Sequence, residues 1–132
     1  MIIRTAKMKD IDQIMVVFKD YDNASIDYLP TKYKLMRNKK KPIEKHIKLA
    51  LEKDIKQKDS KYLVMEDKDK IVGYIFGEIR DDSHPLYDRP KTGELNDLEV
   101  LKEHQGKGIS TKSWEELLAW FNKNKCEMVT LS

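Results

Sequence analysis

One glycine-containing loop constrains the fold of this chain more than any other feature. It joins a strand-like segment at 94–101 to a helical pattern that opens at Thr111, and the residues from Gln105 to Ser110 include two glycines. Such a loop directs several backbone N–H groups and the positive end of a helix dipole at one point. The sequence therefore predicts an anion-binding site where this helix begins.

Strand and helix patterns alternate along the rest of the chain. Apolar stripes predict helices over 11–22, with Asp10 as the N-cap, and over 43–58. Strand patterns cover 2–6, 61–66, 70–80 and 126–131, and a long loop is predicted from Asn23 to Pro42. The short turn inside 61–80 predicts an antiparallel hairpin. The helix before the last strand predicts that this strand runs parallel to 94–101.

The segment 70–80 is predicted to be a central strand. Isoleucines on one face alternate with valine and aromatic residues on the other, so both faces are apolar. Gly73 and Gly77 interrupt the isoleucine face. Because glycine inside a strand often marks a close approach, we expect a helix or a ligand to pack against this face.

Length and composition favour one cytoplasmic domain. The 132 residues leave no room for a second, linker-separated unit, so residues 1–132 are expected to form a single domain. The single Cys126 has no disulfide or zinc companion, which suits a reducing compartment. No apolar run approaches the ~20 residues needed to span a bilayer, and the N-terminus is not that of a signal peptide.

Charged clusters give little support for nucleic-acid or metal binding. The net charge of +3 is small, arginine is scarce, and the lysine-rich run from Lys32 to Lys48 is more typical of a solvated loop than of a phosphate-binding patch. Asp81, Asp82, His84 and Asp88 do not have the spacing of a standard metal site. We therefore expect no metal ion, no membrane partner and no nucleic-acid partner.

Two common glycine motifs do not fit the loop. The phosphate loop of NTPases needs Gly-x-x-x-x-Gly-Lys-Ser/Thr, which is absent. The dinucleotide fingerprint needs a third glycine where Thr111 stands, and it also needs further strands downstream.

The loop instead resembles the Gln/Arg-x-x-Gly-x-Gly/Ala loop of the GNAT superfamily, the acyl-CoA-dependent N-acyltransferases. The similarity extends to Asp97-Leu-Glu-Val-Leu-Lys-Glu103, which resembles the fourth strand of that family, and to the element order over the whole chain. The resemblance implies an α/β (α+β) fold in the order β-α-α-β-β-β-α-β. Its central mixed sheet is mostly antiparallel and is flanked by helices.

The resemblance also implies acetyl-CoA as co-substrate. Backbone amides of the loop would hold the pyrophosphate of coenzyme A, with Lys107 as an added cation; this cradle comprises Gln105, Gly106, Lys107, Gly108, Ile109 and Ser110. Ser110 stands where the family has glycine or alanine, and its hydroxyl can bind a phosphate or cap the helix. Leu98, Glu99 and Val100 would meet the pantetheine arm through main-chain hydrogen bonds, with an amide near Leu98 polarising the thioester carbonyl.

The implied chemistry is direct attack of a primary amine, on a small molecule or a peptide, on the thioester. Such an attack needs a base to neutralise the amine. Glu94 is the first candidate, because some family members carry a glutamate base on this strand. Asp97 is the rival, on the opposite face if the strand is regular, and the reaction can also run without a protein base. The β-bulge that is usual in this family would change which face each residue occupies.

The end of the chain departs from the family pattern. Family members continue past the fifth strand with a further helix and two strands, and here nothing follows Ser132. We expect the strand at 126–131 to be left at an open edge that favours self-association, so that a homo-oligomer would form through it. The alternative to an N-acetyltransferase is therefore a non-catalytic acyl-CoA-binding or oligomerisation module with a C-terminally short GNAT fold.

Overall fold

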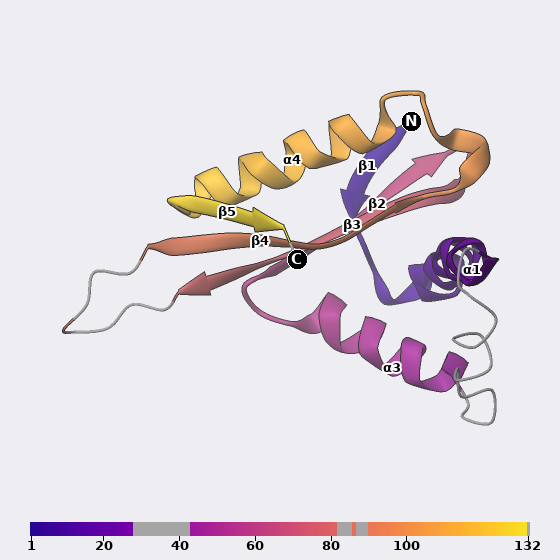
Figure 1. Cartoon of the computed structure of the whole chain (residues 1–132), viewed down its shortest axis with the longest axis horizontal. Coiled ribbons are helices and arrows are strands. Elements are labelled where there is room, and N and C mark those ends of the chain that lie inside the picture. Colours follow the sequence, from indigo (N-terminus) through magenta and orange to yellow (C-terminus); the bar gives the residue numbers. More distant parts are fainter. Residues whose placement is uncertain (28–42, 82–85, 87–89, 132) are drawn as a thin grey trace.

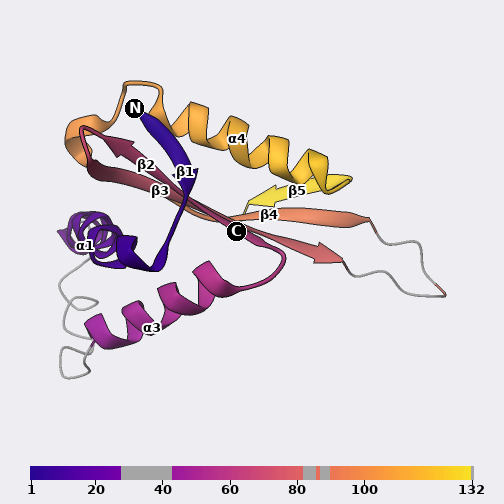
Figure 2. The same ribbon diagram turned by 180° about the vertical axis from the view of Figure 1, so that it is seen from behind.

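A five-stranded sheet separates two layers of helices. The computed structural model describes residues 1–27, 43–81, 86 and 90–131. The sheet has the order β1-β2-β3-β4-β5, and Figures 1 and 2 show α4 on one of its faces and α1 and α3 on the other. The strands are β1 (Ile2–Thr5), β2 (Ser60–Asp67), β3 (Lys70–Asp81), β4 (Lys91–Val100) and β5 (Met128–Leu131). The helices are α1 (Ile11–Asp27), α3 (Ile43–Lys56) and α4 (Ile109–Lys123), with short 3-10 turns η1 (Met8–Asp10) and η2 (Lys102–His104).

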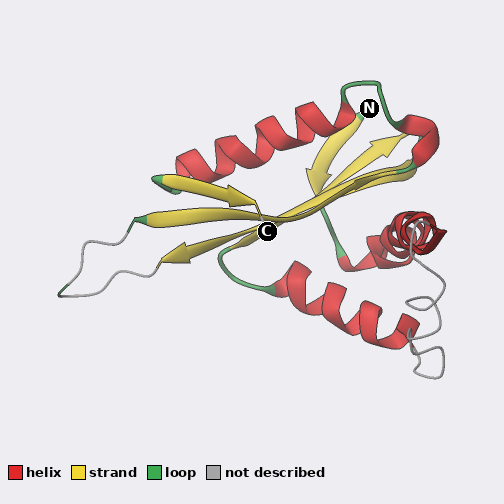
Figure 3. Cartoon of the chain, viewed as in Figure 1, coloured by secondary structure: helices red, strands yellow, loops and turns green. Residues whose placement is uncertain are grey.

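The predicted fold class and element order are confirmed (Figure 3). Strands β1 to β4 pair antiparallel, and β5 pairs parallel to β4, as the hairpin and crossover patterns predicted. The hairpin turn between β2 and β3 is tight because Lys68 and Asp69 both have positive φ angles, 51° and 64°. None of the helices in the described ranges is long and apolar enough to cross a membrane.

Several predicted boundaries were wrong. The helix predicted to end near Asp22 continues to Asp27, because neither glycine nor proline interrupts the sequence before Pro30. Strand β4 begins at Lys91, inside the predicted turn, because Thr92 and Gly93 pair with both β3 and β5. Most of the lysine-rich run, and Asp82, His84 and Asp88 of the acidic loop, lie outside the described residues.

Strand β3 is central and covered on both faces, as predicted. Its apolar residues contribute to one core cluster beneath α1 and α3 and to a second beneath α4. A Cβ atom at Gly77 would lie 2.8 Å from Cζ of Phe121 on α4, so the close approach expected at this glycine is the packing of a helix. At Gly73 the close neighbour is the backbone of β4, with the Glu99 carbonyl 2.8 Å from the Cβ position.

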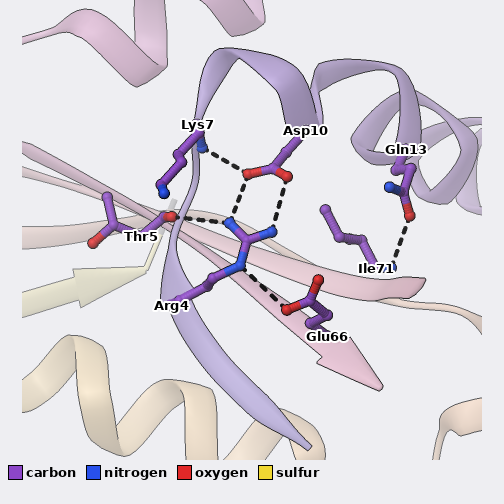
Figure 4. Close-up of polar contacts among 7 residues, drawn as sticks. All are labelled: Arg4, Thr5, Lys7, Asp10, Gln13, Glu66 and Ile71. Atoms are coloured by element: carbon purple, nitrogen blue, oxygen red, sulfur yellow. Dashed lines mark hydrogen bonds and ion pairs between the residues drawn. The ribbon is translucent and has the colours of Figure 1, made fainter. Parts of the chain in front are cut away.

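A buried ion pair ties the first strand to the first helix (Figure 4). The Arg4 guanidinium donates two hydrogen bonds, of 2.8 and 2.9 Å, to the two carboxylate oxygens of Asp10, and a third to Glu66 on β2. Asp10 also accepts the Lys7 N–H at 2.7 Å. The predicted N-cap therefore serves a different purpose: it closes the 3-10 turn that precedes α1 and neutralises Arg4. These bonds hold the pKa of Asp10 below its usual range.

We expect Asp10→Asn to lower the free energy of unfolding by about 2–4 kcal/mol at pH 7. Removing one partner leaves the other charge poorly compensated, and this loss is somewhat below that of a fully buried pair because Arg4 is partly exposed. The Asp10 pKa is lowered in the folded state, so its contribution is present above the unfolded pKa of ~3.9 and is lost as the pH falls through the folded pKa. The difference between wild type and variant should therefore shrink in acid.

Urea unfolding at several pH values measures this difference, and Asp12→Asn is the matched control. Asp12 pairs with Lys48 at 3.6 Å, but 85% of its side chain is exposed. An exposed pair of this kind is expected to contribute less than about 1 kcal/mol. Equal losses in the two variants would contradict the structural weight given to Arg4 and Asp10.

Candidate functional site

Strand β4 has an open edge along its second half. Its parallel pairing with β5 covers only the residues from Thr92 to Leu95, opposite Met128 to Leu131. From Asn96 to Val100, β3 lies on one side, and no strand within the described ranges pairs on the other. Figure 1 shows β5 beside the half of β4 that is farther from the loop to α4. The open half can form main-chain hydrogen bonds with an extended ligand.

A β-bulge marks the point where β4 loses β5. The register to β3 shifts between Phe76 and Gly77, which pair with Asp97 and Leu95, so Asn96 is the extra residue. Leu95 packs with the core under α4, whereas Asp97 lines a cavity with residues of α1 and α3. The bulge expected from the family resemblance is therefore present. It places Asp97 on the face that Glu94 also occupies, and not on the opposite face expected for a regular strand.

The open half of β4 leads directly into the glycine loop. Gly106 and Gly108 have φ angles of 79° and 78°, in the left-handed region that glycine tolerates best, and no atom lies within 4 Å of a Cβ at either position. Gly108 is the N-cap of α4 and offers no side-chain cap, and the first turn of the helix contains no acidic residue. The first helical bond runs from the Lys112 N–H to the Gly108 carbonyl. The N–H groups before Lys112 are left to bind an anion.

The side chains of the loop differ in their environments, and these environments decide which of the predicted binding roles each residue can fill. Gln105 donates its amide N–H to the Val100 carbonyl at 3.0 Å, which fastens the loop to the end of β4. The Ile109 side chain is buried in the core under α1, so only its backbone can face a ligand. Lys107 and Ser110 are exposed. Ser110 does not cap the helix, as was considered from the sequence, because α4 starts two residues earlier than Thr111 and Gly108 holds the cap position.

Two acidic side chains of β4 have raised pKa values. Burial is the main cause for Asp97, which accepts a 3.0 Å hydrogen bond from the Tyr74 hydroxyl. The pKa of Glu99 is raised to about 7 by burial and by its interaction with Asp97. The two groups therefore titrate as a pair that holds one proton up to about neutral pH.

Glu94 has a different environment. Its carboxylate lies 3.4 Å from the Arg80 Nε atom, and 21% of its side chain is exposed. It stands six residues before Val100, roughly 20 Å away at the usual rise of a strand. Asp97 and Glu99 thus lie on the open half of β4 that leads to the glycine loop, whereas Glu94 lies in an ion pair on the half that pairs with β5.

The sequence analysis did not identify the other polar groups that line the same cavity as Asp97. Tyr62 and Tyr74 lie beside it on β2 and β3, and Asp54 lies opposite on α3. Asp54 had a signal that could have been used: it falls seven residues after Ile47 and three after Leu51, within the apolar stripe of its helix. A carboxylate in an apolar stripe is a candidate for a buried, functional position. Among the described residues no group of three His, Cys, Asp or Glu side chains is placed to hold a metal ion.

Comparison with protein families identifies the class to which this fold and site belong. Residues 20–132 match the model described as the acetyltransferase (GNAT) family. Because the match covers most of the chain, the chain belongs to the GNAT acetyltransferase family. No curated protein sequence matches it.

Solved structures share the fold at low sequence identity. A tetramutant of the BH1408 protein from Bacillus halodurans has a TM-score of 0.82 at 19% identity, over 100% of this chain and 82% of that one. The aminoglycoside 6'-N-acetyltransferase AAC(6')-IG from Acinetobacter haemolyticus has a TM-score of 0.73 at 13% identity, over 100% and 79%. A predicted acetyltransferase with acetyl-CoA from Clostridium acetobutylicum has a TM-score of 0.73 at 15% identity, over 99% and 79%.

Proposed function

We propose that this chain transfers an acetyl group from acetyl-CoA to a primary amine by direct attack. The observation that carries the proposal is the continuity of the open half of β4 with the glycine loop and the uncapped start of α4. An extended, amide-containing arm that ends in phosphates matches this arrangement. Its amides would pair along the strand, and its phosphates would meet the loop amides. Membership of the GNAT family supports the same ligand.

Each predicted coenzyme-binding residue has a specific task in this proposal. Leu98, Glu99 and Val100 would contribute main-chain groups to the pantetheine arm, because the side chain of Val100 is buried. Gly106, Lys107, Gly108, Ile109 and Ser110 would bind the pyrophosphate through N–H groups, the Lys107 ammonium and the Ser110 hydroxyl, with Gln105 fixing the loop. The Leu98 N–H would polarise the thioester carbonyl.

The Asp97 and Glu99 pair is the proton acceptor that the geometry favours. An alkylamine has a pKa near ~10, so at neutral pH it arrives as an ammonium and has to lose a proton before it can attack. The pair lies on the open half of β4 and becomes doubly ionised above about neutral pH, and in that form it attracts the ammonium and accepts its proton. The amine nitrogen then forms a bond to the acetyl carbon and the carbon–sulfur bond breaks. The electron pair leaves with sulfur, which takes a proton to become the thiol.

Glu94, the first candidate from the sequence, remains an alternative base. Its carboxylate lies 3.4 Å from the Arg80 Nε atom, so an approaching amine would compete with this ion pair. Asp97 was the rival candidate, and its burial and its bond to Tyr74 support it.

Acetyl-CoA binding should be measured first, by thermal unfolding with increasing ligand. We expect a rise in the melting temperature by mass action, equivalent to about 2.7 kcal/mol at a ligand concentration of 100 Kd. Lys107→Ala should weaken binding several-fold because it removes a cation from the phosphate site. Lys123→Ala, at the other end of α4, is the charge-matched control and should not. No stabilisation by millimolar acetyl-CoA would rule out the proposed function.

The pH dependence of kcat/KM tests the choice of base. We expect a rising limb with an apparent pKa of about 7 that belongs to the carboxyl pair. Glu99→Gln should move this limb to lower pH, because the negative charge next to Asp97 is removed. Asp97→Asn should lower kcat about 10²–10⁴-fold, the usual contribution of a general base.

The matched control for the base is Glu94→Gln, which removes one carboxylate from the same strand. It should leave the position of the limb unchanged. If Glu94→Gln instead abolishes the limb while Asp97→Asn keeps it, the base is Glu94, as the sequence first suggested.

A second candidate function is an acyl-CoA-binding or oligomerisation module without catalysis, and the exposed edge of β5 favours it. Met128, Val129 and Leu131 are 50%, 41% and 72% exposed on this strand. An apolar strand edge is a template for pairing with another chain.

If β5 mediates self-association, dilution should shift the chain from dimer to monomer in analytical ultracentrifugation. Leu131→Lys should favour the monomer at every concentration, whereas Leu49→Lys, at another exposed leucine on α3, should not. A monomer at all concentrations would contradict an oligomerisation module. Release of free thiol with any amine would contradict a non-catalytic one.

A further inference from the structure

A small cavity beside Asp97 is lined by apolar side chains and by carboxylates. It has a volume of about 210 Å³ and lies between the sheet and the helices α1 and α3. Its apolar lining includes Phe18, Ile47, Leu51 and the rings of Tyr62, Tyr74 and Phe76; Asp54 and Asp97 are its acidic members. Cavities for drug-sized ligands usually measure ~300–1,000 Å³, so this one suits a smaller molecule.

In the described part of the chain, Asp97 in the cavity and Glu78 beside it accept hydrogen bonds from neutral donors. The pKa of Asp54 is raised by burial and by repulsion from Glu78 and Asp97, which outweigh the attraction of the neighbouring Lys53. Glu78 is held by amides only, from Asn96 at 2.7 Å and from Gln57 at 3.4 Å. Asp97 is held by the Tyr74 hydroxyl. Neutral donors leave the negative charge in place, so a cation entering the cavity would relieve this repulsion.

The Tyr62 side chain gives independent support for a cationic ligand. Tyr62 lines the cavity and is only 5% exposed, and its hydroxyl makes no hydrogen bond to any residue in the described ranges. Its ring stacks on Phe76 with centroids 5.1 Å apart and lies 5.6 Å from the centroid of Tyr74. Aromatic faces attract cations, and a phenolic oxygen can accept a hydrogen bond from an ammonium group. The ring and the hydroxyl of Tyr62 therefore fit an ammonium group that donates to the Tyr62 oxygen.

We infer that the acceptor is a small aliphatic diamine, or the end of a linear polyamine. This inference rests on the proposed function. One ammonium would lie between Asp54 and Glu78 on the α3 side, the methylene chain would lie along the apolar and aromatic walls, and the second amine would reach Asp97 beside the open half of β4. The second amine is the one acetylated. It gives its proton to the Asp97 and Glu99 pair, and the products are the monoacetylated diamine and free coenzyme A thiol.

Other amine classes fit the cavity less well. An amino acid or a peptide N-terminus carries a carboxylate or carbonyl next to the amine, which would meet the carboxylates. A simple alkyl monoamine fills the apolar walls but leaves Asp54 without a partner. A multi-ring aminoglycoside is cationic but larger than the cavity that these residues form.

Calorimetric titration of the whole chain with 1,4-diaminobutane, n-butylamine and glutamate tests the inference without requiring catalysis. We expect the diamine to bind at least ten-fold more tightly than butylamine, and glutamate not to bind. Asp54→Asn should reduce the affinity for the diamine to that for butylamine. Glu52→Gln removes the same charge from α3 at a residue outside the cavity and should retain the preference.

A third variant, Tyr62→Phe, keeps the inference testable if a carboxylate variant misfolds. Asp54→Asn is itself expected to fold, because burial already disfavours the charged form of Asp54. Tyr62→Phe keeps the ring and removes only the hydroxyl, and it should weaken diamine binding several-fold. Equal affinities for diamine and monoamine, absence of diamine binding, or equal effects of Asp54→Asn and Glu52→Gln would each overturn the inference.

Acetyl-CoA titrated into the same samples separates this inference from the proposed function. If acetyl-CoA binds and a neutral or acidic amine is acetylated while diamines are not, the acceptor class is wrong and the acetyltransferase proposal stands. If acetyl-CoA does not bind, the acetyltransferase proposal fails, and diamine binding to the free protein still decides whether the cavity is a cation site.

Discussion

The extra residue in β4 is the constraint on which the rest of the site depends. A strand alternates its side chains between two faces, so inserting Asn96 opposite the Phe76 and Gly77 step changes the face of every later residue. Without the bulge, Asp97 would lie under α4 with Leu117 and Phe121, which are almost completely buried. An unpaired carboxylate there would cost several kcal/mol. With the bulge, Asp97 faces Tyr74 and the cavity.

The same bulge coincides with the end of the pairing between β4 and β5. Parallel pairing stops at Leu95, immediately before the extra residue. A local kink that increases the strand twist is the usual effect of a bulge, and it moves the following residues away from a neighbouring strand. One inserted residue therefore accounts for two features of the site: the carboxylates that face the cavity, and the free main-chain edge that leads to the glycine loop.

This arrangement places the positive groups at the start of α4 and the carboxylates of the cavity at separate sites. The start of α4 collects N–H groups and Lys107, with no acid in its first turn, and it suits the phosphates of the acyl donor. The cavity under α3 is lined by the carboxylates of Asp54 and Asp97, and it suits a cationic acceptor. The second half of β4 lies between the two. Donor and acceptor would thus approach one strand from different sides, without competing for the same charges.

The sequence predicted the elements well because their signals are local. The glycine loop, the tight turn after Asp67 and the two apolar faces of β3 are each visible within a few residues. The bulge is not local, since only the register with β3 reveals that Asn96 is extra, and Asp97 was for this reason expected on the wrong face. Tyr62 and Asp54 were missed for a similar reason. They come from segments distant in the chain, and their importance arises only where folding places them around one cavity.

The proposed proton acceptor and the proposed acceptor class support each other electrostatically. The Asp97 and Glu99 pair keeps one proton up to about neutral pH because burial disfavours the charged form and because the two adjacent charges repel. An ammonium group arriving beside the pair would offset that repulsion, lower the pKa of Glu99 and release its proton to solvent. The doubly ionised pair is then a better acceptor for the proton that the amine must lose. A cationic substrate would in this way prepare its own base, whereas Glu94 lies in an ion pair with Arg80 on the half of β4 that pairs with β5.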